Sequence, residues 1–316
     1  MKIYKIFIVI LNWNRPGDTL ECLQSLKQLF MKNFMVTVVL VDNGSGDDSV
    51  TRFKKFQPGD LAMKIIENKK NAGFAAGNNL GINYSLSQEA DFVLFLNNDT
   101  IVDKNFISEI ILTSEEKEEV GIFTPKIYFA KGFEFHKTYK KSELGRVIWS
   151  FGGNIDWQNM YAQNKHVDDV DSGQLNKNFE TDFATGAAMF VKADVLKMHG
   201  GFDENYYLYM EDVDFCERYT RSGGKILAVS DAIVWHKVSQ SSGIGSDLND
   251  YFITRNRLYF AQKFAPLRTK VALLRESIKF IFCGRPWQRR GVVDYLTGNL
   301  KIGSWKASVR ENENGK

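Results

Sequence analysis

Carboxylates in three polar clusters are the residues of this chain best suited to chemistry on a charged substrate. Asp42 and Asp99 each follow an apolar run, and Glu211 and Asp212 stand side by side. Carboxylate oxygens suit Mg²⁺ or Mn²⁺, which keep coordination sites for water and phosphate. A carboxylate can also take a proton as a general base. These clusters are therefore candidates for binding a divalent cation beside a phosphate-bearing ligand and for acting as a general base.

Two segments have the composition of a nucleotide-binding site. Asp42 can accept hydrogen bonds from a ribose hydroxyl or a base N–H group. The segment from Asn71 to Asn79 contains Gly73 and Gly77, and glycine lets the main chain come close to a ligand. Neither a GxGxxG nor a GxxxxGK[ST] pattern occurs in the sequence, so the usual signatures of dinucleotide and P-loop sites are missing.

Each cluster also has an ordinary structural explanation, which the residues alone leave open. Asp42 can form a turn after a strand, and residues 97–99 can close another strand as an Asx turn. Gly73 can simply begin a helix. Glu211 and Asp212 can form the solvated first turn of a helix, where the dipole favours carboxylates.

The first hundred residues alternate short apolar runs with helix-like segments, as in a parallel sheet covered by helices. Ligands bind beyond the carboxyl ends of such strands, so we expect the polar clusters at one edge of the sheet. The predicted strands are 6–11, 36–41, 64–67 and 92–96, and the predicted helices begin at Pro16 and cover 74–87.

The pattern weakens in the second part of the chain. Aromatic and charged residues mix over about 128–180, which predicts an inserted hairpin or mobile flap. A regular pattern then returns. It predicts an apolar segment over 184–191, a helix near Asp194, a helix over 212–221, a strand over 226–229, and final helices over 250–263 and 268–283.

The end of the chain is basic. From Lys263 onward there are 12 Lys and Arg against 4 Asp and Glu, a surplus of 8, so the preceding part carries 3 minus 8, or −5. In the helix predicted over 268–283, Val271, Leu274, Ile278 and Ile281 share one face, and Arg268, Arg275 and Lys279 gather on another. Two placements stay open: this helix lies on an anionic membrane surface, or its apolar face packs on the protein.

Composition excludes several classes of protein. With 44% apolar and 25% charged residues, the chain is typical of a globular protein. Three separated cysteines without a CxxC pair predict no disulfide framework and fit a reducing cytoplasm. The apolar run 6–11 is too short for a signal sequence, and no run approaches a membrane span. The basic tail does not alternate with stacking aromatics, so nucleic-acid binding is not expected.

Taken in order, these motifs resemble the inverting family 2 glycosyltransferases, which have the GT-A fold. The likeness covers residues 4 to 263, and the ordered set is more specific than any single motif. Its segments are Asn-Trp-Asn-Arg-Pro at 12–16, Val-Asp-Asn-Gly-Ser at 41–45, the 71–78 segment, Asn-Asn-Asp at 97–99, Thr-Gly-Ala at 185–187, Gly-Gly-Phe-Asp-Glu at 200–204, Glu-Asp-Val-Asp at 211–214, His236, and Arg-Asn-Arg at 255–257.

The resemblance implies a role for each matching residue. Asp212 is the implied base with Glu211 beside it, and Asp99 and His236 are the implied ligands of Mg or Mn. Thr185, Gly186 and Ala187 are expected near the acceptor or donor sugar. The residues implied in nucleotide-sugar binding are Asn12, Asp42, Asn71, Gly73, Gly77, Asn78, Asn97, Asn98 and Arg255, with His236 and Arg255 facing the diphosphate. Many relatives have Asp where this chain has Asn97, so Asp99 is expected to hold the cation nearly alone.

The implied fold is α/β: a Rossmann-like, mostly parallel central sheet flanked by helices, with a C-terminal helical extension. Residues 1–263 form the expected catalytic domain. Its nucleotide-binding half is 1–100, and its acceptor-binding half is 101–263 with the insertion at about 128–180. Residues 264–316 form the basic helical extension.

The expected activity is transfer of a sugar from a nucleoside diphosphate carrier to a hydroxyl with inversion. The sequence is similar to bacterial rhamnosyltransferase-like members, which implies dTDP-rhamnose or a UDP-sugar as donor and a role in surface polysaccharide synthesis. The acceptor is a saccharide or lipid-linked saccharide, and the location is the cytoplasm or the inner face of the membrane. One alternative is a sugar nucleotidyltransferase, whose Gly-rich basic loop is missing after the first strand. Another is a carbohydrate-binding protein without catalysis, which does not need Asp99 and Asp212.

Overall fold

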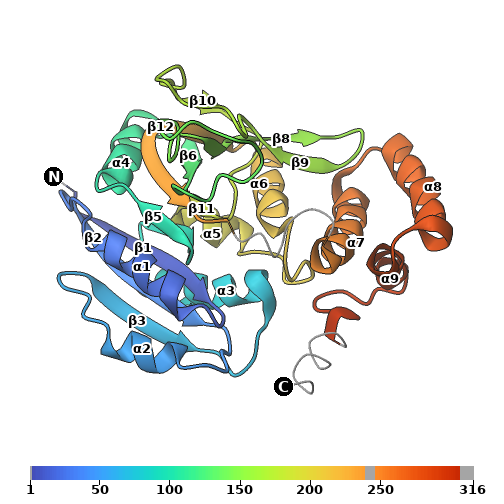
Figure 1. The fold of residues 1–316 in the computed structure, drawn as a ribbon, viewed down its shortest axis with the longest axis horizontal. Coiled ribbons are helices and arrows are strands. Elements are labelled where there is room, and N and C mark those ends of the chain that lie inside the picture. The colour runs from blue at the N-terminus through green and yellow to red at the C-terminus, as the bar shows by residue number, and fades with distance from the viewer. Residues whose placement is uncertain (1, 239–245, 307–316) are drawn as a thin grey trace.

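A ten-stranded mixed sheet lies at the centre of the computed structural model, which describes residues 2–238 and 246–306 (Figure 1). A separate hairpin pairs β8 (Gly153–Asp156) with β9 (Tyr161–Asn164). The strands of the large sheet are β1 (Tyr4–Asn12), β2 (Phe34–Asp42), β3 (Ala62–Glu67), β4 (Phe92–Asn97), β5 (Thr100–Val102), β6 (Val120–Phe129), β7 (Ile148–Phe151), β10 (Phe179–Glu180), β11 (Ala188–Lys192) and β12 (Lys225–His236).

The strand order brings the polar ends of several strands to one edge. The order is β10-β12-β6-β11-β4-β1-β2-β3, and β4, β1, β2 and β3 are parallel. Their register pairs Asn12 with Asp42, and Leu11 with Asn97. β11 runs antiparallel to β4, so its first residue lies beside the end of β4. The four predicted N-terminal strands are confirmed, and they end at the same edge, as expected.

Helices cover both faces of the sheet, and alternate residues of β1 therefore enter two different cores. Ile8 packs on the face covered by α1 and α4, and Val9 packs on the face covered by α3, α5 and α6. Burial on both faces explains why β1 reads as a continuous apolar run. The helices in the described residues are α1 (Pro16–Leu26), α2 (Ser49–Lys55), α3 (Gly73–Ser87), α4 (Phe106–Glu116), α5 (Ala193–His199), α6 (Glu211–Arg221), α7 (Asp247–Phe264), α8 (Leu267–Cys283) and α9 (Pro286–Leu296).

The region predicted as an insertion contains β7, the β8–β9 hairpin and β10, so the expected hairpin is present. The strand predicted over 226–229 is longer than expected. β12 continues to His236 after a register shift between Val229 and Ile233, because its second half pairs with both β5 and β6. This extension carries His236 to the polar edge of the sheet.

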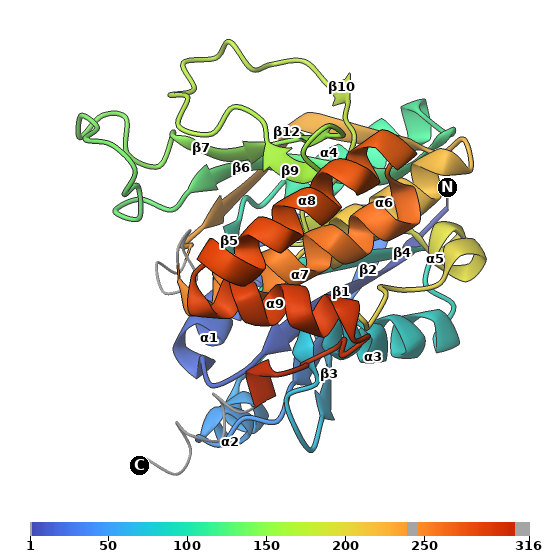
Figure 2. The same ribbon diagram turned by 90° about the vertical axis from the view of Figure 1, so that its right-hand side faces the viewer.

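The C-terminal helices pack at one end of the molecule (Figure 1). α7 and α8 confirm the two predicted final helices, and α9 packs on α7. Figure 2 faces this end and shows α8 and α9 on the outside of α7. No helix among the described residues is both long and apolar enough to cross a bilayer. Residues 307–316 of the predicted extension lie outside the described residues.

Candidate functional site

A cavity of about 560 Å³ opens at the polar edge of the sheet. It gathers residues from strand ends, from the start of α6 and from the end of β12, which are far apart in the sequence. Nine of the predicted site residues line it: Asn97, Asn98, Asp99, Thr185, Gly186, Ala187, Glu211, Asp212 and His236. The structure therefore brings the predicted cation ligands and the predicted base into one cavity.

Asp99 and His236 lie next to each other on one wall of this cavity. Asp99 Oδ1 lies 2.9 Å from His236 Nε2, because the pairing of β5 with β12 places Thr100 opposite His236. Burial raises the pKa of the Asp99 carboxyl, but His236, a main-chain hydrogen bond and Lys237 together hold that pKa below its ordinary value. The Trp149 ring stands edge-on to His236 at 4.5 Å between centroids. An ionised carboxylate thus sits beside an imidazole nitrogen.

These two side chains fit a divalent cation that keeps most of its ligands from solvent and phosphate. Carboxylate oxygen and imidazole nitrogen both bind Mn²⁺, and carboxylate oxygen binds Mg²⁺. The described residues hold no group of three or more His, Cys, Asp and Glu arranged around one point. A pair of side chains leaves most coordination sites of a cation open to other ligands. Both implied ligands are therefore adjacent in the structure, and their role in binding a cation stays a prediction.

Glu211 and Asp212 begin α6 at the other side of the cavity. Asp212 Oδ2 accepts the Gly186 N–H at 2.8 Å, and its Oδ1 accepts the Val213 N–H at 2.8 Å. Burial raises the pKa of Asp212. Burial and the neighbouring Asp212 charge raise the pKa of Glu211 well above its ordinary value, and Glu211 Oε2 has no hydrogen-bond partner among the described residues. Asp212 is the better oriented of the two to act as a base.

A strained turn places this acidic pair. Tyr207, Tyr209 and Met210 have positive φ angles of 66°, 68° and 71°, which are rarely adopted by bulky residues. Asn256 of α7 compensates, because its Nδ2 lies 2.7 to 3.0 Å from the carbonyl oxygens of residues 206, 208 and 209. α7 therefore fixes the turn from which the Glu211 and Asp212 side chains enter the cavity.

Arg255 supports the same turn and does not line the cavity. Its guanidinium is fully buried. It donates to the Tyr206 carbonyl at 2.8 Å and to the Lys301 carbonyl at 2.5 Å. In this structure its guanidinium donates to main-chain carbonyls and to side chains of α7, so its contacts are structural and a contact with the diphosphate stays a prediction. The family resemblance singled out Arg255, but its hydrogen-bond partners Tyr206 and Lys301 lie far away in the sequence.

We expect Arg255→Ala to lower the free energy of unfolding by about 3 kcal/mol, because buried carbonyl groups lose their donors. Urea denaturation measures this change. Arg52→Ala on the exposed surface of α2 is the matched control and should leave stability within about 0.5 kcal/mol. Unchanged stability of Arg255→Ala together with weaker nucleoside diphosphate binding would return Arg255 to the phosphate site.

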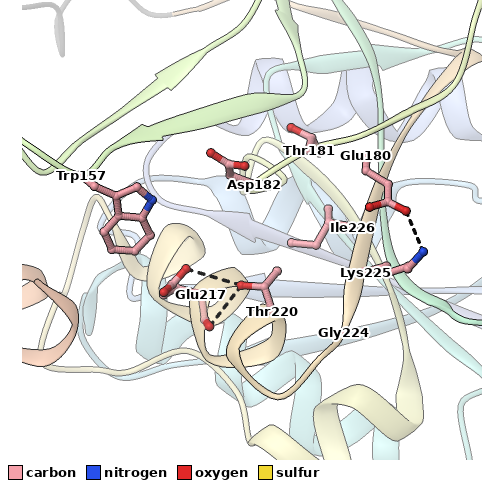
Figure 3. A pocket seen from close by; sticks show the side chains of 9 residues that line it. All are labelled: Trp157, Glu180, Thr181, Asp182, Glu217, Thr220, Gly224, Lys225 and Ile226. Carbon is pink, nitrogen blue, oxygen red and sulfur yellow. Dashed lines mark hydrogen bonds and ion pairs between the residues drawn. The ribbon is translucent and has the colours of Figure 1, made fainter.

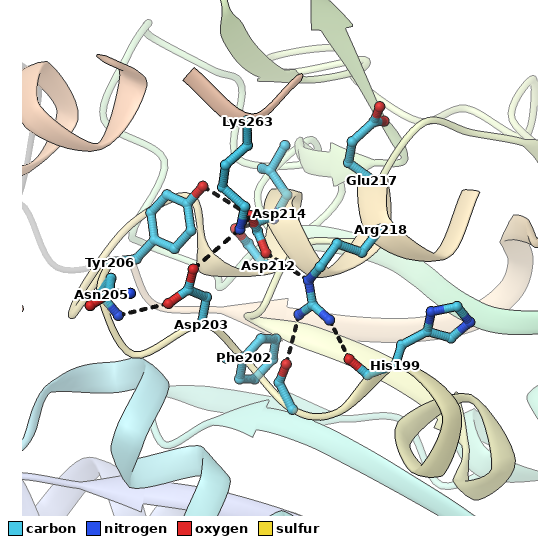
Figure 4. A network of polar contacts seen from close by, with 12 residues as sticks. His199, Phe202, Asp203, Asn205, Tyr206, Asp212, Asp214, Glu217, Arg218 and Lys263 are labelled. Atoms are coloured by element: carbon cyan, nitrogen blue, oxygen red, sulfur yellow. Dashed lines mark hydrogen bonds and ion pairs between the residues drawn. The ribbon is translucent and has the colours of Figure 1, made fainter. Parts of the chain in front are cut away.

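A polar network around Asp214 anchors α6 (Figure 4). Asp214 is fully buried and accepts from Tyr206 Oη at 3.0 Å, from Arg218 Nε at 2.8 Å and from Lys263. Arg218 also donates to the Gly201 carbonyl at 2.7 Å. Buried charges need such complete pairing. The network therefore ties the first turn of α6 to α7 and to the 199–206 segment.

The nucleotide-binding residues predicted at the ends of β1 and β2 form a chain of hydrogen bonds beside the cavity. Asp42 Oδ1 accepts from Asn12 Nδ2 at 2.9 Å and from Ser45 Oγ at 2.6 Å. Thr19 Oγ1 donates to Asn12 Oδ1 at 2.7 Å and accepts from Asn98 Nδ2 at 2.9 Å. The chain links the Asp42 turn to the turn that carries Asp99.

The predicted glycine-rich segment packs against the strained turn. Gly73 has φ +88°, and a Cβ there would lie 2.4 Å from the Tyr207 ring, so only glycine fits. Tyr207 O accepts the Phe74 N–H at 2.6 Å. The side chain of Asn43, which the sequence reasoning missed, donates to Asn71 Oδ1 at 3.0 Å and accepts the Ala72 N–H. Its position next to Asp42 was the available signal.

Two other residues of that segment serve packing in this structure. A Cβ on Gly77 would lie 2.5 Å from the Leu11 side chain, so glycine lets α3 approach β1. Asn78 is buried and donates to the Phe74 carbonyl at 2.9 Å. Like Asn12, Asp42, Asn71, Gly73 and Arg255, they do not line the 560 Å³ cavity. The cavity adjoins this region through Leu11.

Aromatic residues from the predicted insertion form a further wall that sequence reasoning did not find. Phe135, Trp149 and Tyr161 line the cavity, and Phe135 and Tyr161 are about 40% exposed. Aromatic faces bind the apolar faces of sugar rings through burial and dispersion. The mixture of aromatic and charged residues over 128–180 was a signal for this wall.

A second hollow of about 240 Å³ lies elsewhere, between the 180–182 segment and α6 (Figure 3). Trp157, Asp182 and Glu217 are among its lining residues. None of the predicted site residues lines it. The larger cavity is therefore the candidate active site.

Known proteins resemble this chain in sequence and in fold. The low-salt glycan biosynthesis hexosyltransferase Agl10 of Haloferax volcanii is 26% identical over 254 residues, covering 79% of this chain and 73% of the relative. An N-acetylglucosaminyl-diphospho-decaprenol L-rhamnosyltransferase of Mycobacterium tuberculosis is 25% identical over 243 residues, covering 72% of this chain and 75% of the relative. The mannosyltransferase PcManGT of Pyrobaculum calidifontis, solved with GDP-Man and Mn²⁺, aligns with a TM-score of 0.51 and 16% identity. That alignment covers 98% of this chain and 79% of the other.

The family itself is established by a match over more than half of the chain. Residues 7–196 match the model of glycosyl transferase family 2. This range is more than half of the chain and contains most of β1, all of β2 to β4, Asp42, the 71–78 segment and Asp99. The mixed sheet with helices on both faces agrees with the fold expected from the motifs. The chain therefore belongs to glycosyltransferase family 2 and has the GT-A fold.

Proposed function

We propose that this glycosyltransferase moves a sugar from a nucleoside diphosphate to an acceptor hydroxyl with inversion of configuration. The observation that carries the proposal is the shared cavity of about 560 Å³, which has the Asp99–His236 pair and Asp212 on its walls. A single displacement needs a stabilised leaving group and a base for the incoming hydroxyl. One cavity offers both.

Each residue has a defined part in this mechanism. Asp99 and His236 would hold a divalent cation, Mg or Mn, and that cation would offset the negative charge that develops on the departing diphosphate. Asp212 takes the proton of the acceptor hydroxyl as its oxygen attacks the anomeric carbon. The Gly186 N–H keeps the Asp212 carboxylate oriented through a 2.8 Å hydrogen bond. The attacking oxygen arrives opposite the diphosphate, so the configuration at the anomeric carbon inverts.

The donor and acceptor belong to the same proposal. The donor is dTDP-rhamnose or a UDP-sugar, supported by the rhamnosyltransferase named among the relatives. The acceptor is a saccharide or a lipid-linked saccharide, supported by the diphospho-decaprenol in that relative's name. The exposed aromatic rings of Phe135 and Tyr161 offer sugar-binding faces. The enzyme acts in bacterial surface polysaccharide synthesis, in the cytoplasm or at the inner face of the membrane.

Product analysis tests this function directly. The purified chain is incubated with Mn²⁺ and a panel of dTDP- and UDP-sugars, and the released nucleotide is identified. Release of nucleoside diphosphate with transfer of the sugar is the expected result. Release of pyrophosphate from a nucleoside triphosphate would instead identify a sugar nucleotidyltransferase. Binding of saccharide without turnover of any donor would identify a non-catalytic carbohydrate-binding protein.

We expect Asp42→Ala to lose most of the thermal stabilisation that a nucleoside diphosphate gives the parent. A ligand at about 100 times its Kd adds about 2.7 kcal/mol, so a lost contact is visible as a smaller shift in Tm. A thermal-shift screen of nucleoside diphosphates, with and without Mn²⁺, measures it and identifies the base. Asp60→Ala, in the exposed loop before β3, is the control. Equal ligand-induced shifts in Asp42→Ala and the parent would remove Asp42 from the nucleotide site.

A further inference from the structure

α8 carries an apolar stripe that faces away from the protein. Leu267, Val271, Leu274, Ile278 and Phe282 are 77%, 43%, 54%, 52% and 74% exposed. Their spacing of three or four residues places them along one side of the helix. We name these five residues the α8 stripe. Exposed apolar surfaces of this extent on one element mark interaction sites.

The opposite side of α8 already contacts the protein. Thr269, Leu273 and Ser277 are buried, and Phe280 and Ile281 pack against the main core at its margin. Of the four residues expected on one apolar face, only Ile281 turns toward the protein. The sequence left open whether this helix packs on the protein or lies on a membrane. In the structure, one side of α8 packs on the protein and the α8 stripe on the other side is exposed to solvent.

Basic side chains border the α8 stripe. At 100° per residue, Arg268, Arg275 and Lys279 lie along one margin and Lys270 lies along the other. All four are exposed, and none forms an ion pair with another described residue. The acid on this helix, Glu276, is engaged by Arg257 of α7 at 2.8 Å. The outer surface of α8 thus combines apolar side chains with unpaired positive charge.

We propose that the α8 stripe docks on a lipid bilayer that contains anionic phospholipids. An amphipathic helix of this kind lies in the plane of the interface, with its apolar side chains among the acyl chains and its basic margins at the headgroups. Charge selects this occupant, because the basic margins complement anionic headgroups and would repel each other across two copies of the helix. The five side chains of the α8 stripe would enter the interface between headgroups and acyl chains.

The same helix braces a wall of the active-site cavity. Arg257, held by Glu276 of α8, donates to the Asn159 carbonyl at 2.6 Å and lies 4.0 Å from the Tyr161 ring centroid. Thr269 of α8 donates to the Trp157 carbonyl at 3.3 Å. These contacts hold the β8–β9 hairpin, and Tyr161 of that hairpin lines the cavity. Docking would place this wall toward the bilayer and would favour an acceptor that is held in a membrane. This inference rests on the proposed function and deepens it.

Vesicle sedimentation tests the docking without any sugar nucleotide. The full chain is spun with vesicles of phosphatidylglycerol and phosphatidylcholine, or of phosphatidylcholine alone. The parent should pellet with the anionic vesicles and stay in the supernatant with the neutral ones. Leu274→Glu should lower the partition coefficient at least about tenfold, since an apolar side chain is replaced by a negative one. Arg275→Glu combined with Lys279→Glu should also weaken binding to the anionic vesicles.

Leu112→Glu is a matched control, because Leu112 is 55% exposed on α4, and Leu274 is 54% exposed on α8. It should bind vesicles like the parent. Cooperative thermal unfolding of each variant without ligand, at a Tm close to that of the parent, shows that the variants are folded. The proposal is overturned if the parent does not pellet with anionic vesicles. It is also overturned if Leu274→Glu binds these vesicles as well as the parent does. A parent dimer that Leu274→Glu converts to a monomer, without vesicle binding, also overturns it and assigns the α8 stripe to a second copy.

The outcomes for docking and for catalysis are separable. A chain that binds vesicles but transfers no sugar refutes the proposed function alone. A chain that transfers sugar to a soluble acceptor but ignores vesicles refutes the docking alone.

Discussion

Asp212→Asn should lower kcat for sugar transfer by about 10³-fold while leaving donor affinity within about twofold, because a positioned general base contributes about 10²- to 10⁴-fold. Asparagine has nearly the same shape, and its carbonyl oxygen can still accept the Gly186 N–H that Asp212 accepts at 2.8 Å. It cannot take a proton from the acceptor. Steady-state release of nucleoside diphosphate measures the rate, and donor-induced thermal stabilisation measures binding.

Asp194→Asn is a suitable control, because Asp194 also lies in the first turn of a helix but is exposed on α5. It should keep parental activity.

The pH profile gives a second readout for Asp212. The base works when ionised, so kcat/KM should fall as the pH falls through the Asp212 pKa, which burial places above that of an exposed aspartate. Asp212→Asn with activity within a few-fold of the parent would exclude Asp212 as the base and direct attention to Glu211.

Asp99→Asn should lower kcat/KM at least about 100-fold and abolish the response to Mn²⁺, because the site loses its charged oxygen ligand. The parent should lose activity in EDTA and recover it when Mn²⁺ is restored. Donor-induced thermal stabilisation should depend on Mn²⁺ in the parent and be independent of it in Asp99→Asn. These three measurements separate loss of the cation site from general damage.

Asp103→Asn is the control for this variant. Asp103 also follows a strand in the same segment, where it accepts the Asn105 N–H at 2.8 Å before α4. Its replacement should leave the Mn²⁺ dependence unchanged. Full activity of the parent in metal-free buffer would contradict the cation site altogether, and parental Mn²⁺ dependence in Asp99→Asn would contradict the assignment of Asp99.

Much of the N-terminal sheet could be predicted because its strands are buried on both faces. The runs at 6–11 and 92–96 are apolar throughout, and the polar residues after them mark the edge where ligands bind. β6 was missed although all ten of its residues are buried. Pro125 and Lys126 interrupt its apolar run, and Lys126 is accommodated by a 2.8 Å ion pair with Asp171. Asp171 lies 45 residues away in the sequence, so no pattern near Lys126 predicts that its charge is neutralised.

The site shows a similar division between local chemistry and distant contacts. The ordered motifs identified Asp99, His236 and Asp212, and the structure gathers all three around one cavity. Their roles stay predictions, as does the division of the chain near residue 100. Arg255 was assigned to the diphosphate by the family resemblance. Whether such a guanidinium meets phosphate or buried carbonyls depends on the turn at 206–209 and on residue 301, which no local pattern reveals.

The packing of α9 on α7 has a genetic consequence. Tyr251 of α7 donates to Asp294 of α9, and the Ser304 N–H binds the same carboxylate at 2.7 Å, while Val292 is wholly buried. A stop codon just after Phe264 would strip these partners and leave apolar surface of α7 bare. Such an allele should yield a destabilised protein, so a nonsense change at this position should reduce the amount of folded protein.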